Sequence, residues 1–366
     1  MIRSVDYRAL SLPVLKSDVR AYKAATRASG GRPVRSETGR IVGWGCLITL
    51  LAGALLTGDL VLIIVSLIGL SQDPPILIGI AGLVVPPIVT AVLLWLSVRA
   101  ATRANEQLWQ NEFRLSRFAA DNGLVFSAST PNPHYPGLIF NQGDSRQTVN
   151  HVRSADGRFF DIGNFQFTTT NHSTSTTTTH QRGFMALHLD RRLPHMVLDA
   201  KSNGSLGLAA FGQEPRLSLE GNFDDFFTLY CPRQYERDAL YLFTPDLMAL
   251  LIDEASPFDV EIIDNWMFVY STGPFPPLQI GVYERLFRII ETVGAKTLSQ
   301  SARYQDDRVI EAPFEANVVA PPGQRLRRRF PPALVVLLIV LAAAFVLPIV
   351  ISIAVFLAQS ISITIR

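Results

Sequence analysis

The six histidines of the chain lie between positions 134 and 195, and this clustering raises the hypothesis of a metal site. They are His134, His151, His172, His180, His188 and His195. Their spacings match no zinc motif, and no cysteine pair accompanies them. In the sequence His188-Leu189-Asp190, the strand period would place both polar side chains on one face, which supplies only two ligands. We therefore expect surface or structural histidines and predict no metal-ligating residue.

Carboxylates gather in two short segments, where a pair of them could act as general acid and base. The first segment holds Glu220, Asp224 and Asp225, and the second holds Asp253, Glu254, Asp259, Glu261 and Asp264. Helix capping is the interpretation we favour for the first, because Asn222 is a good N-cap residue. Asp224 and Asp225 would then lie in the first turn, where the helix dipole favours negative charge. An enzyme site around His188, Asp190 and Asp199 with nearby acids stays open as an alternative.

Motifs of common enzyme and nucleotide-binding families are missing from the sequence. It contains no glycine-rich phosphate loop, no Gly-x-Ser-x-Gly and no His-Glu-x-x-His. Cys46 lies in an apolar run and Cys231 in the polar part of the chain, so we expect no disulfide. The net charge of +2 does not indicate a nucleic-acid partner. We predict no catalytic residue, no cofactor-binding residue, no cofactor and no nucleic-acid binding.

The polar middle of the chain combines strand patterns with helix patterns. Residues 105–121 have the spacing of an amphipathic helix, and Asp156-Gly157 is a turn signal between strands at 147–153 and 159–168. Further strands are expected at 124–127, 184–189, 196–199, 217–219 and 227–231, a second hairpin at 260–263 and 266–270, and helices at 245–255 and 277–293. The Ser/Thr-rich residues 168–180 offer nothing to bury and are expected to be a loop or an exposed hairpin tip. Strands in a run flanked by helices indicate an α+β fold with a mainly antiparallel sheet.

Three apolar stretches are long enough to cross a membrane, which takes roughly 20 residues. They run from about Ile41 to Leu70, from Pro75 to Val98 and from Pro332 to Leu357. Asp59 interrupts the first stretch, and we interpret it as a carboxylate that reaches the outer headgroups. The sequence therefore predicts three transmembrane helices in addition to the α+β domain.

Basic residues flank these stretches asymmetrically. Arginines and lysines precede the first stretch, Arg99 and Arg103 follow the second, and Arg325 to Arg329 precede the third. The short link between the first two has no basic residue. Because positive charge is retained on the cytoplasmic side, this pattern places the N-terminus and the polar domain in the cytoplasm. We expect a multi-pass protein of a bacterial plasma membrane.

These patterns divide the chain into six parts. They are a basic cytoplasmic segment at 1–40, a transmembrane hairpin at 41–98, a cytoplasmic α+β domain at 99–311, a Pro/Arg-rich linker at 312–331, a transmembrane helix at 332–358 and a short tail at 359–366.

One stretch consists of the segments Phe223 to Tyr230, Tyr235 to Met248 and Phe258 to Tyr270. Its second segment ends with the element Leu-Phe-Thr-Pro-x-Leu-Met. This stretch of about fifty residues resembles a family of uncharacterised bacterial membrane-anchored proteins. Members of that family have two N-terminal transmembrane helices before an α+β cytoplasmic domain. The resemblance implies the same architecture and a bacterial inner membrane, and it implies no activity. The apolar stretch at the C-terminus departs from the family pattern.

Three functions stay open. The first is a non-enzymatic, membrane-tethered binding or scaffold module, whose partners would be the lipid bilayer, anionic headgroups and an unidentified membrane or cytoplasmic protein. The second is a subunit of a membrane transport assembly, in which Asp59 would take part. The third is the membrane enzyme with an unfamiliar site. The absence of catalytic motifs favours the first.

Overall fold

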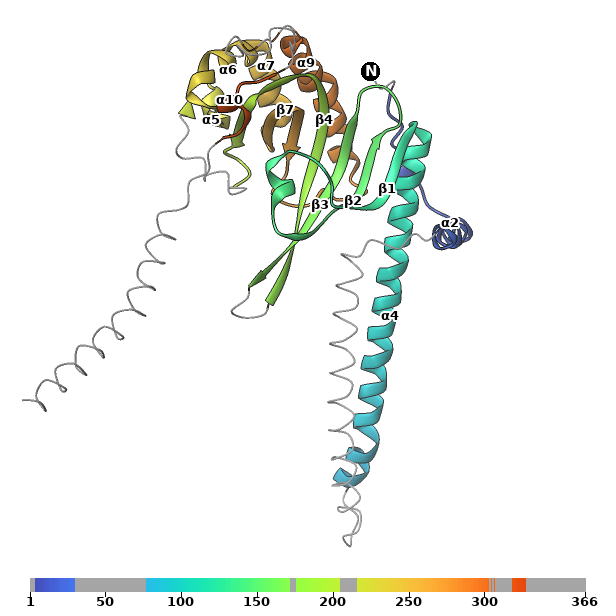
Figure 1. Ribbon diagram of the computed structural model, residues 1–366. Coiled ribbons are helices and arrows are strands. Elements are labelled where there is room, and N and C mark those ends of the chain that lie inside the picture. Colours follow the sequence, from blue (N-terminus) through green and yellow to red (C-terminus); the bar gives the residue numbers. More distant parts are fainter. Residues whose placement is uncertain are drawn as a thin grey trace, which may run out of the picture.

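The centre of the molecule is a curved antiparallel sheet with helices packed around it (Figure 1). The computed structural model describes residues 4–29, 77–171, 176–204, 216–302, 304, 306 and 318–326. The strands are β1 (Leu124–Pro131), β2 (Asp144–Ser154), β3 (Phe160–Asn171), β4 (Thr176–Ala200), β5 (Arg216–Leu217), β6 (Phe227–Tyr230) and β7 (Asp259–Tyr270). All pairings are antiparallel, in the order β1-β2-β3-β4-β6-β5, with β7 on β4. The predicted α+β class with a mainly antiparallel sheet is confirmed.

The helices lie at both ends of the strand-rich region and between its later strands. They are α1 (Arg8–Ser11), α2 (Lys16–Ala28), α4 (Leu77–Asp121), α5 (Phe223–Phe226), α6 (Glu236–Leu242), α7 (Pro245–Leu250), α8 (Ile280–Ile289), α9 (Ala295–Ser301) and α10 (Pro321–Gln324), with single turns η1 (Leu138–Asn141) and η3 (Arg233–Tyr235) and π-helical turns η4 (Leu251–Ala255) and η5 (Ile290–Gly294). The predicted helix at 105–121 is confirmed as the last part of α4.

The hairpin predicted around Asp156-Gly157 is confirmed, since β2 pairs with β3 on either side of that turn. Gly157 has a φ of 75°, a conformation that glycine adopts without steric cost. β3 then pairs with β4 along its full length, from Phe160 opposite Leu187 to Asn171 opposite Thr176. Residues 168–171 and 176–180 of the Thr-rich segment therefore form the exposed ends of two long paired strands that project from the sheet (Figure 1).

The hairpin predicted around Asp264-Asn265 is wrong, because both halves belong to the single strand β7. β7 finds its partner in β4, from Phe184 opposite Tyr270 to Leu198 opposite Val260. Asp264 has a φ of 53°, and the register shifts beside it, so the strand bends at this point without reversing. A turn signal in the sequence cannot distinguish a bend of this kind from a hairpin.

The helix predicted at 277–293 does not end at Gly294. α8, η5 and α9 follow one another without a break to Ser301. Gly294 is instead a close-packing position, because a Cβ atom built there would lie 2.6 Å from Leu187 Cδ2 of the sheet. The glycine is required by the approach of the helix to β4 and does not act as a C-cap.

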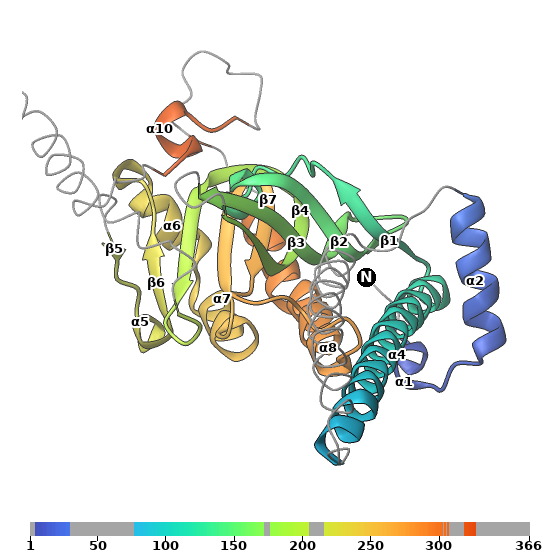
Figure 2. The same ribbon diagram turned by 90° about the horizontal axis from the view of Figure 1, so that it is seen from below.

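The two faces of the sheet carry different coverings. The helices α4 to α9 pack on the first face, with Leu115, Phe118, Leu247 and Leu286 in a large buried cluster. The second face is covered by a smaller buried cluster, to which the strands contribute aromatic residues such as Phe165, Phe184 and Phe268. The connection between β1 and β2, which contains η1, closes this second face (Figure 2).

α4 is 45 residues long, and its N-terminal part projects away from the domain (Figure 1). α2 runs across α4 and packs Tyr22 against Trp109 and Phe113, with ring centroids 6.4 Å and 5.6 Å apart (Figures 1 and 2). The predicted basic N-terminal segment therefore contains an ordered helix that rests on α4.

Within the ranges described above, no helix combines the length with the apolar character needed to cross a membrane. The stretches predicted to cross it at 41–70 and 332–357, together with Asp59, lie outside the described residues. The stretch predicted at 75–98 overlaps α4 from Leu77 onward. The membrane part of the predicted fold stays a prediction.

Candidate functional site

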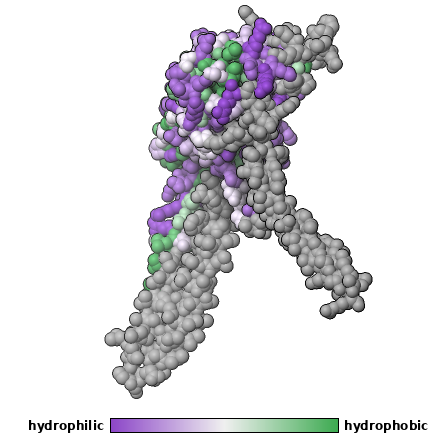
Figure 3. Space-filling view, turned by 90° about the vertical axis from the view of Figure 1, so that its left-hand side faces the viewer, coloured by the Kyte–Doolittle hydropathy of each residue, from purple (hydrophilic) through white to green (hydrophobic). Residues whose placement is uncertain are grey.

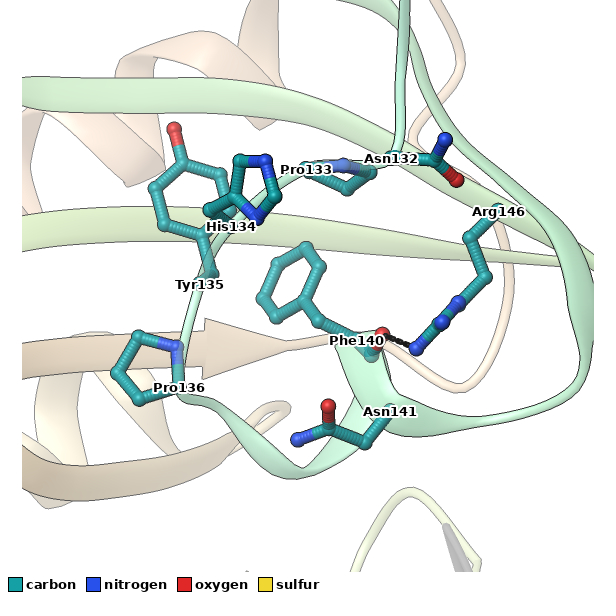
Figure 4. Close-up of a pocket in the computed structure, with 8 residues that line it drawn as sticks. All are labelled: Asn132, Pro133, His134, Tyr135, Pro136, Phe140, Asn141 and Arg146. Atoms are coloured by element: carbon teal, nitrogen blue, oxygen red, sulfur yellow. Dashed lines mark hydrogen bonds between the residues drawn. The ribbon is translucent and has the colours of Figure 1, made fainter.

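The connection between β1 and β2, residues 132–143, carries an open depression of about 450 Å³ on its outer surface (Figure 4). The lining residues are Asn132, Pro133, His134, Tyr135, Pro136, Phe140, Asn141 and Arg146. Arg146 donates a hydrogen bond of 3.3 Å to the Phe140 carbonyl, which fixes the guanidinium beside the loop. We call residues 132–143 the covering loop.

A chain of buried and half-buried polar groups supports the covering loop at Tyr135. The Tyr135 hydroxyl donates to the Asp161 carboxylate at 2.7 Å, and His151 Nδ1 lies 2.9 Å from the same carboxylate. Since a carboxylate only accepts hydrogen bonds, Nδ1 carries a proton, and Nε2 forms a second hydrogen bond of 2.8 Å with Thr130 Oγ1. Burial, followed by the charge of Asp161, raises the pKa of Tyr135. This tyrosine therefore acts as a hydrogen-bond donor at all ordinary pH values.

A second buried network supports the covering loop at Leu138. The Glu261 carboxylate accepts hydrogen bonds from the Leu138 N–H at 2.8 Å and the Tyr270 hydroxyl at 2.6 Å. His195 Nδ1 accepts a 2.9 Å hydrogen bond from the Leu326 N–H, so Nε2 carries the proton and donates to Glu261 at 2.8 Å. Glu261 and His195 are both 1% exposed. One carboxylate therefore connects the covering loop, β4, β7 and the C-terminal segment.

Two glycines leave the space that these networks need. A Cβ atom at Gly137 would lie 2.2 Å from the Tyr270 hydroxyl, and one at Gly163 would lie 2.3 Å from His151 Cβ. Asn150, directly before His151, has a φ of 50° and marks a bulge in β2. The bulge and the two glycines bring the covering loop and the imidazole close to the sheet.

The segment 318–326 lies within the predicted linker and is seated on the sheet. The Ala320 N–H and the Tyr235 hydroxyl both donate to Asp306, at 2.9 Å and 2.6 Å. Arg325 forms an ion pair of 3.0 Å with Asp264, and Leu326 is buried in the smaller cluster on the second face of the sheet. The chain is thus fixed to the domain immediately before its run of arginines.

Of the enzyme site considered from the sequence, His188 and Asp190 line one depression and Asp199 is not among its lining residues. Asp190 accepts two hydrogen bonds from the Arg158 guanidinium, at 2.9 Å and 3.0 Å, and this contact lowers its pKa. His188 Nε2 accepts from the Asn265 amide at 2.7 Å. Asp199 lies eleven residues further along β4, in a half-buried position that raises its pKa. Arg158, His188 and Asp190 line a second depression of about 440 Å³, in which the charge of Arg158 is already paired.

The other histidines serve separate contacts. His180 stacks on Phe167 and pairs with Thr169 Oγ1 at 2.9 Å on the projecting hairpin. His134 is exposed at the depression, and His172 lies outside the described residues. In the described part of the chain, no three His, Cys, Asp or Glu side chains form a group that could hold a metal ion.

The acidic segments are also divided among separate roles. Asp224 lies in the first turn of α5 and accepts from the Leu219 N–H at 3.2 Å and from Ser218 Oγ. Asn222 occupies the N-cap position, where its side chain makes no capping hydrogen bond. Glu254 pairs with Arg288 at 2.9 Å. Cys231 is buried, and Cys46 lies outside the described residues.

Asp259 is a buried acid whose two carboxylate oxygens have different surroundings. Its Oδ1 accepts from the Ala200 N–H at 2.8 Å and from the Asn203 amide at 3.0 Å, and its buried Oδ2 has no partner among the described residues. Burial raises the pKa of Asp259 from 3.8 to about 7. The carboxyl group is therefore partly protonated near neutral pH.

Asp259→Asn is expected to change the pH dependence of stability. Because the pKa is raised on folding, the folded state of the parent chain binds the proton more tightly, and stability is lost as pH rises from 3.8 to about 7. The amide keeps the acceptor for Ala200 and carries no charge. The variant should be more stable than the parent at pH 8, by on the order of 2–4 kcal/mol, and close to it at pH 4. Urea unfolding at the two pH values measures this difference, and an equal difference at both would refute the assignment.

Sequence reasoning missed both buried histidine–carboxylate pairs and Arg146. The first pair had a detectable signal, because the predicted hairpin register places His151 close to Asp161 across two adjacent strands. The second pair had no detectable signal in the sequence, since His195 and Glu261 are 66 positions apart and come together only in the folded chain.

Comparisons with known proteins give little similarity. No protein-family model matches the chain, and no curated protein matches it. One similar solved structure is the crystal structure of the mycobacterial trehalose monomycolate transport factor A, TtfA, at 12% identity and a TM-score of 0.36. The match covers 51% of this chain and 93% of that one. A TM-score this low does not establish a shared fold.

The family resemblance of the segment from Phe223 to Tyr270 is wrong, because no family model matches the chain. Phe223, Phe227, Leu242 and Leu247 in that segment are buried core residues. Apolar side chains at such spacings recur in unrelated domains because a core requires them.

Proposed function

We propose that the protein is a membrane-tethered, non-enzymatic binding or scaffold module, whose domain lies at the cytoplasmic face of a bacterial plasma membrane. The supporting observation is the apolar surface of α4 where it projects from the domain. Exposed apolar residues there are Ile88, Val92, Trp95, Leu96 and Val98, each between 48% and 59% exposed. Figure 3 shows hydrophobic side chains on this projecting part, below the hydrophilic ones near the domain.

The boundary of this apolar surface has the composition of a membrane interface. The Arg99 guanidinium lies 4.8 Å from the centre of the Trp95 ring, and Arg103 follows one turn later. Tryptophan and basic residues are enriched where a helix leaves the hydrocarbon region on the cytoplasmic side. The 22 residues from Leu77 to Val98 would extend about 33 Å as a helix, close to the thickness of the hydrocarbon core.

α2 supports contact with anionic headgroups. It runs across α4 and would lie parallel to the bilayer if α4 enters along the membrane normal (Figures 1 and 2). Lys16 and Arg20 are exposed on it, and Leu12 and Leu15 are exposed directly before it. Basic residues near an anionic surface each contribute about 1 kcal/mol of attraction.

The buried networks favour binding over catalysis. His151, Asp161, His195 and Glu261 use their polar atoms for hydrogen bonds within the interior. Their arrangement fixes the covering loop and the C-terminal segment, and a rigid surface held at two ends suits the recognition of a partner.

Membrane fractionation tests the tether. The full chain, expressed in bacteria, should stay in the membrane pellet after extraction with alkaline carbonate. The double variant Val92→Asp, Leu96→Asp should be recovered in the pellet in a smaller amount than the parent chain, since a charge in the hydrocarbon core costs about 2.5–3.5 kcal/mol for each residue and opposes insertion of this segment. Ala104→Asp, Gln107→Asp adds the same two charges at exposed positions on the polar part of α4; it is the control and should remain in the pellet. Release of the parent chain by carbonate would overturn the proposal.

A further inference from the structure

The depression on the covering loop contains an unbalanced positive charge. Arg146 is permanently charged, His134 stands beside it at the surface, and none of the lining residues is acidic. A guanidinium offers five N–H donors. In the described part of the chain, the Arg146 side chain uses one of them, in its 3.3 Å hydrogen bond to the Phe140 carbonyl. The remaining donors can bind an oxyanion in the bidentate geometry that arginine favours.

One side of the depression is lined by the half-buried Tyr135, with Pro133 and Pro136 beside it. The Tyr135 ring packs on the buried Phe140, with ring centroids 4.9 Å apart. Figure 4 shows the Phe140 ring between the side chains of His134 and Tyr135 and that of Arg146, with the Asn141 amide at the edge. The volume of about 450 Å³ is in the range of small-molecule sites. Charge at one end and rings at the other suit an amphipathic anion.

The backbone around Arg146 is held in conformations that non-glycine residues rarely adopt. Asn132 has a φ of 47° and Ser145 a φ of 49°, and the Asn132 N–H donates to the Arg146 carbonyl at 2.8 Å. Gly143 has a φ of 59° and no room for a Cβ atom, which would lie 2.4 Å from the Thr168 carbonyl. Such residues cluster at ligand sites, where the surrounding structure maintains them.

We propose that this depression binds a small organic oxyanion that carries a ring or another apolar group, with Arg146 as the main anion contact. The Tyr135 and Leu138 hydrogen bonds to the sheet preorganise the site from below. The inference does not depend on the membrane tether.

Calorimetric titration of the full chain in mild detergent tests the site, with phenyl phosphate as the probe and inorganic phosphate for comparison. The parent chain should bind phenyl phosphate at one site and inorganic phosphate more weakly. Arg146→Gln should weaken the affinity for phenyl phosphate ten-fold or more, since charge-assisted hydrogen bonds to an anion are lost, at roughly 1.4 kcal/mol for each factor of ten. Arg158→Gln removes an arginine that is already paired with Asp190 and should leave the affinity unchanged.

A second variant covers the case in which Arg146→Gln disturbs the fold. His134→Ala removes an exposed imidazole that can donate a hydrogen bond to the anion, and it should weaken phenyl phosphate binding a few-fold. If the parent chain shows no saturable binding, or if both variants bind as tightly as the parent, the depression is not an oxyanion site.

The same chemistry could come from a lipid headgroup or from a soluble metabolite, and nanodiscs separate these sources. In nanodiscs with phosphatidate, a headgroup in the site would compete with phenyl phosphate and lower its apparent affinity relative to phosphatidylcholine nanodiscs. Equal affinities in the two kinds of nanodisc indicate a soluble ligand. Either result supports the site and identifies the source of its ligand.

Discussion

Glu261→Ala is expected to lower the free energy of unfolding by about 3–5 kcal/mol. The change removes the acceptor for the Leu138 N–H, the Tyr270 hydroxyl and His195 Nε2, and all three donors remain buried. A buried donor without a partner costs about 1–3 kcal/mol. Urea unfolding of the full chain, followed by tryptophan fluorescence, measures the loss.

The matched control is Glu254→Ala, which removes a carboxylate from a surface ion pair. Arg288, its partner at 2.9 Å, is half-exposed, and such pairs contribute about 0–1 kcal/mol. Similar losses for the two variants would show that the Glu261 network does not fix the covering loop and the C-terminal segment.

Gly163→Ala is expected to lower the free energy of unfolding by about 2–3 kcal/mol, because the added methyl group has no space. It would lie 2.3 Å from His151 Cβ and 2.7 Å from His151 Cα, and the second of these atoms belongs to the backbone. The strands β2 and β3 would have to separate, which weakens the His151–Asp161 contact. The variant should also weaken binding at the covering loop.

Gly281→Ala is the control, and its expected effect on the free energy of unfolding has the opposite sign. Gly281 lies in α8, and a Cβ atom there would meet nothing within 4 Å. Alanine should stabilise the helix by about 0.5–1 kcal/mol. If Gly163→Ala also stabilised the protein, the close packing of His151 against β3 would be contradicted.

The sequence was sufficient to predict elements whose signals are local. The amphipathic spacing at 105–121 and the turn at Asp156-Gly157 depend on neighbouring residues, and both predictions are confirmed. The extent of β7 depends on β4, which supplies its hydrogen-bonding partners from far along the chain. The strand therefore continues through Asp264, where a local reading expects a turn.

The candidate site was beyond prediction for the same reason. His195, Glu261 and Leu326 are brought together by three separate parts of the chain. His188 and Asp190, which lie two positions apart in sequence, gave a stronger local signal, and in the fold they have separate hydrogen-bond partners. The residues next to Arg146 in the sequence do not indicate a site, because most residues that line its depression belong to the covering loop.

The depth of α4 in a bilayer tests the central claim most directly. A single cysteine is placed at Val92 or at Glu106, in a chain with Cys46→Ser and Cys231→Ala, and labelled with an environment-sensitive fluorophore in liposomes. Both positions are exposed on α4, and they are about 21 Å apart along the helix. If α4 tethers the module, lipids with a spin label on the acyl chain will quench the label at position 92 strongly and the label at position 106 weakly. Equal, weak quenching at both positions would contradict the membrane tether.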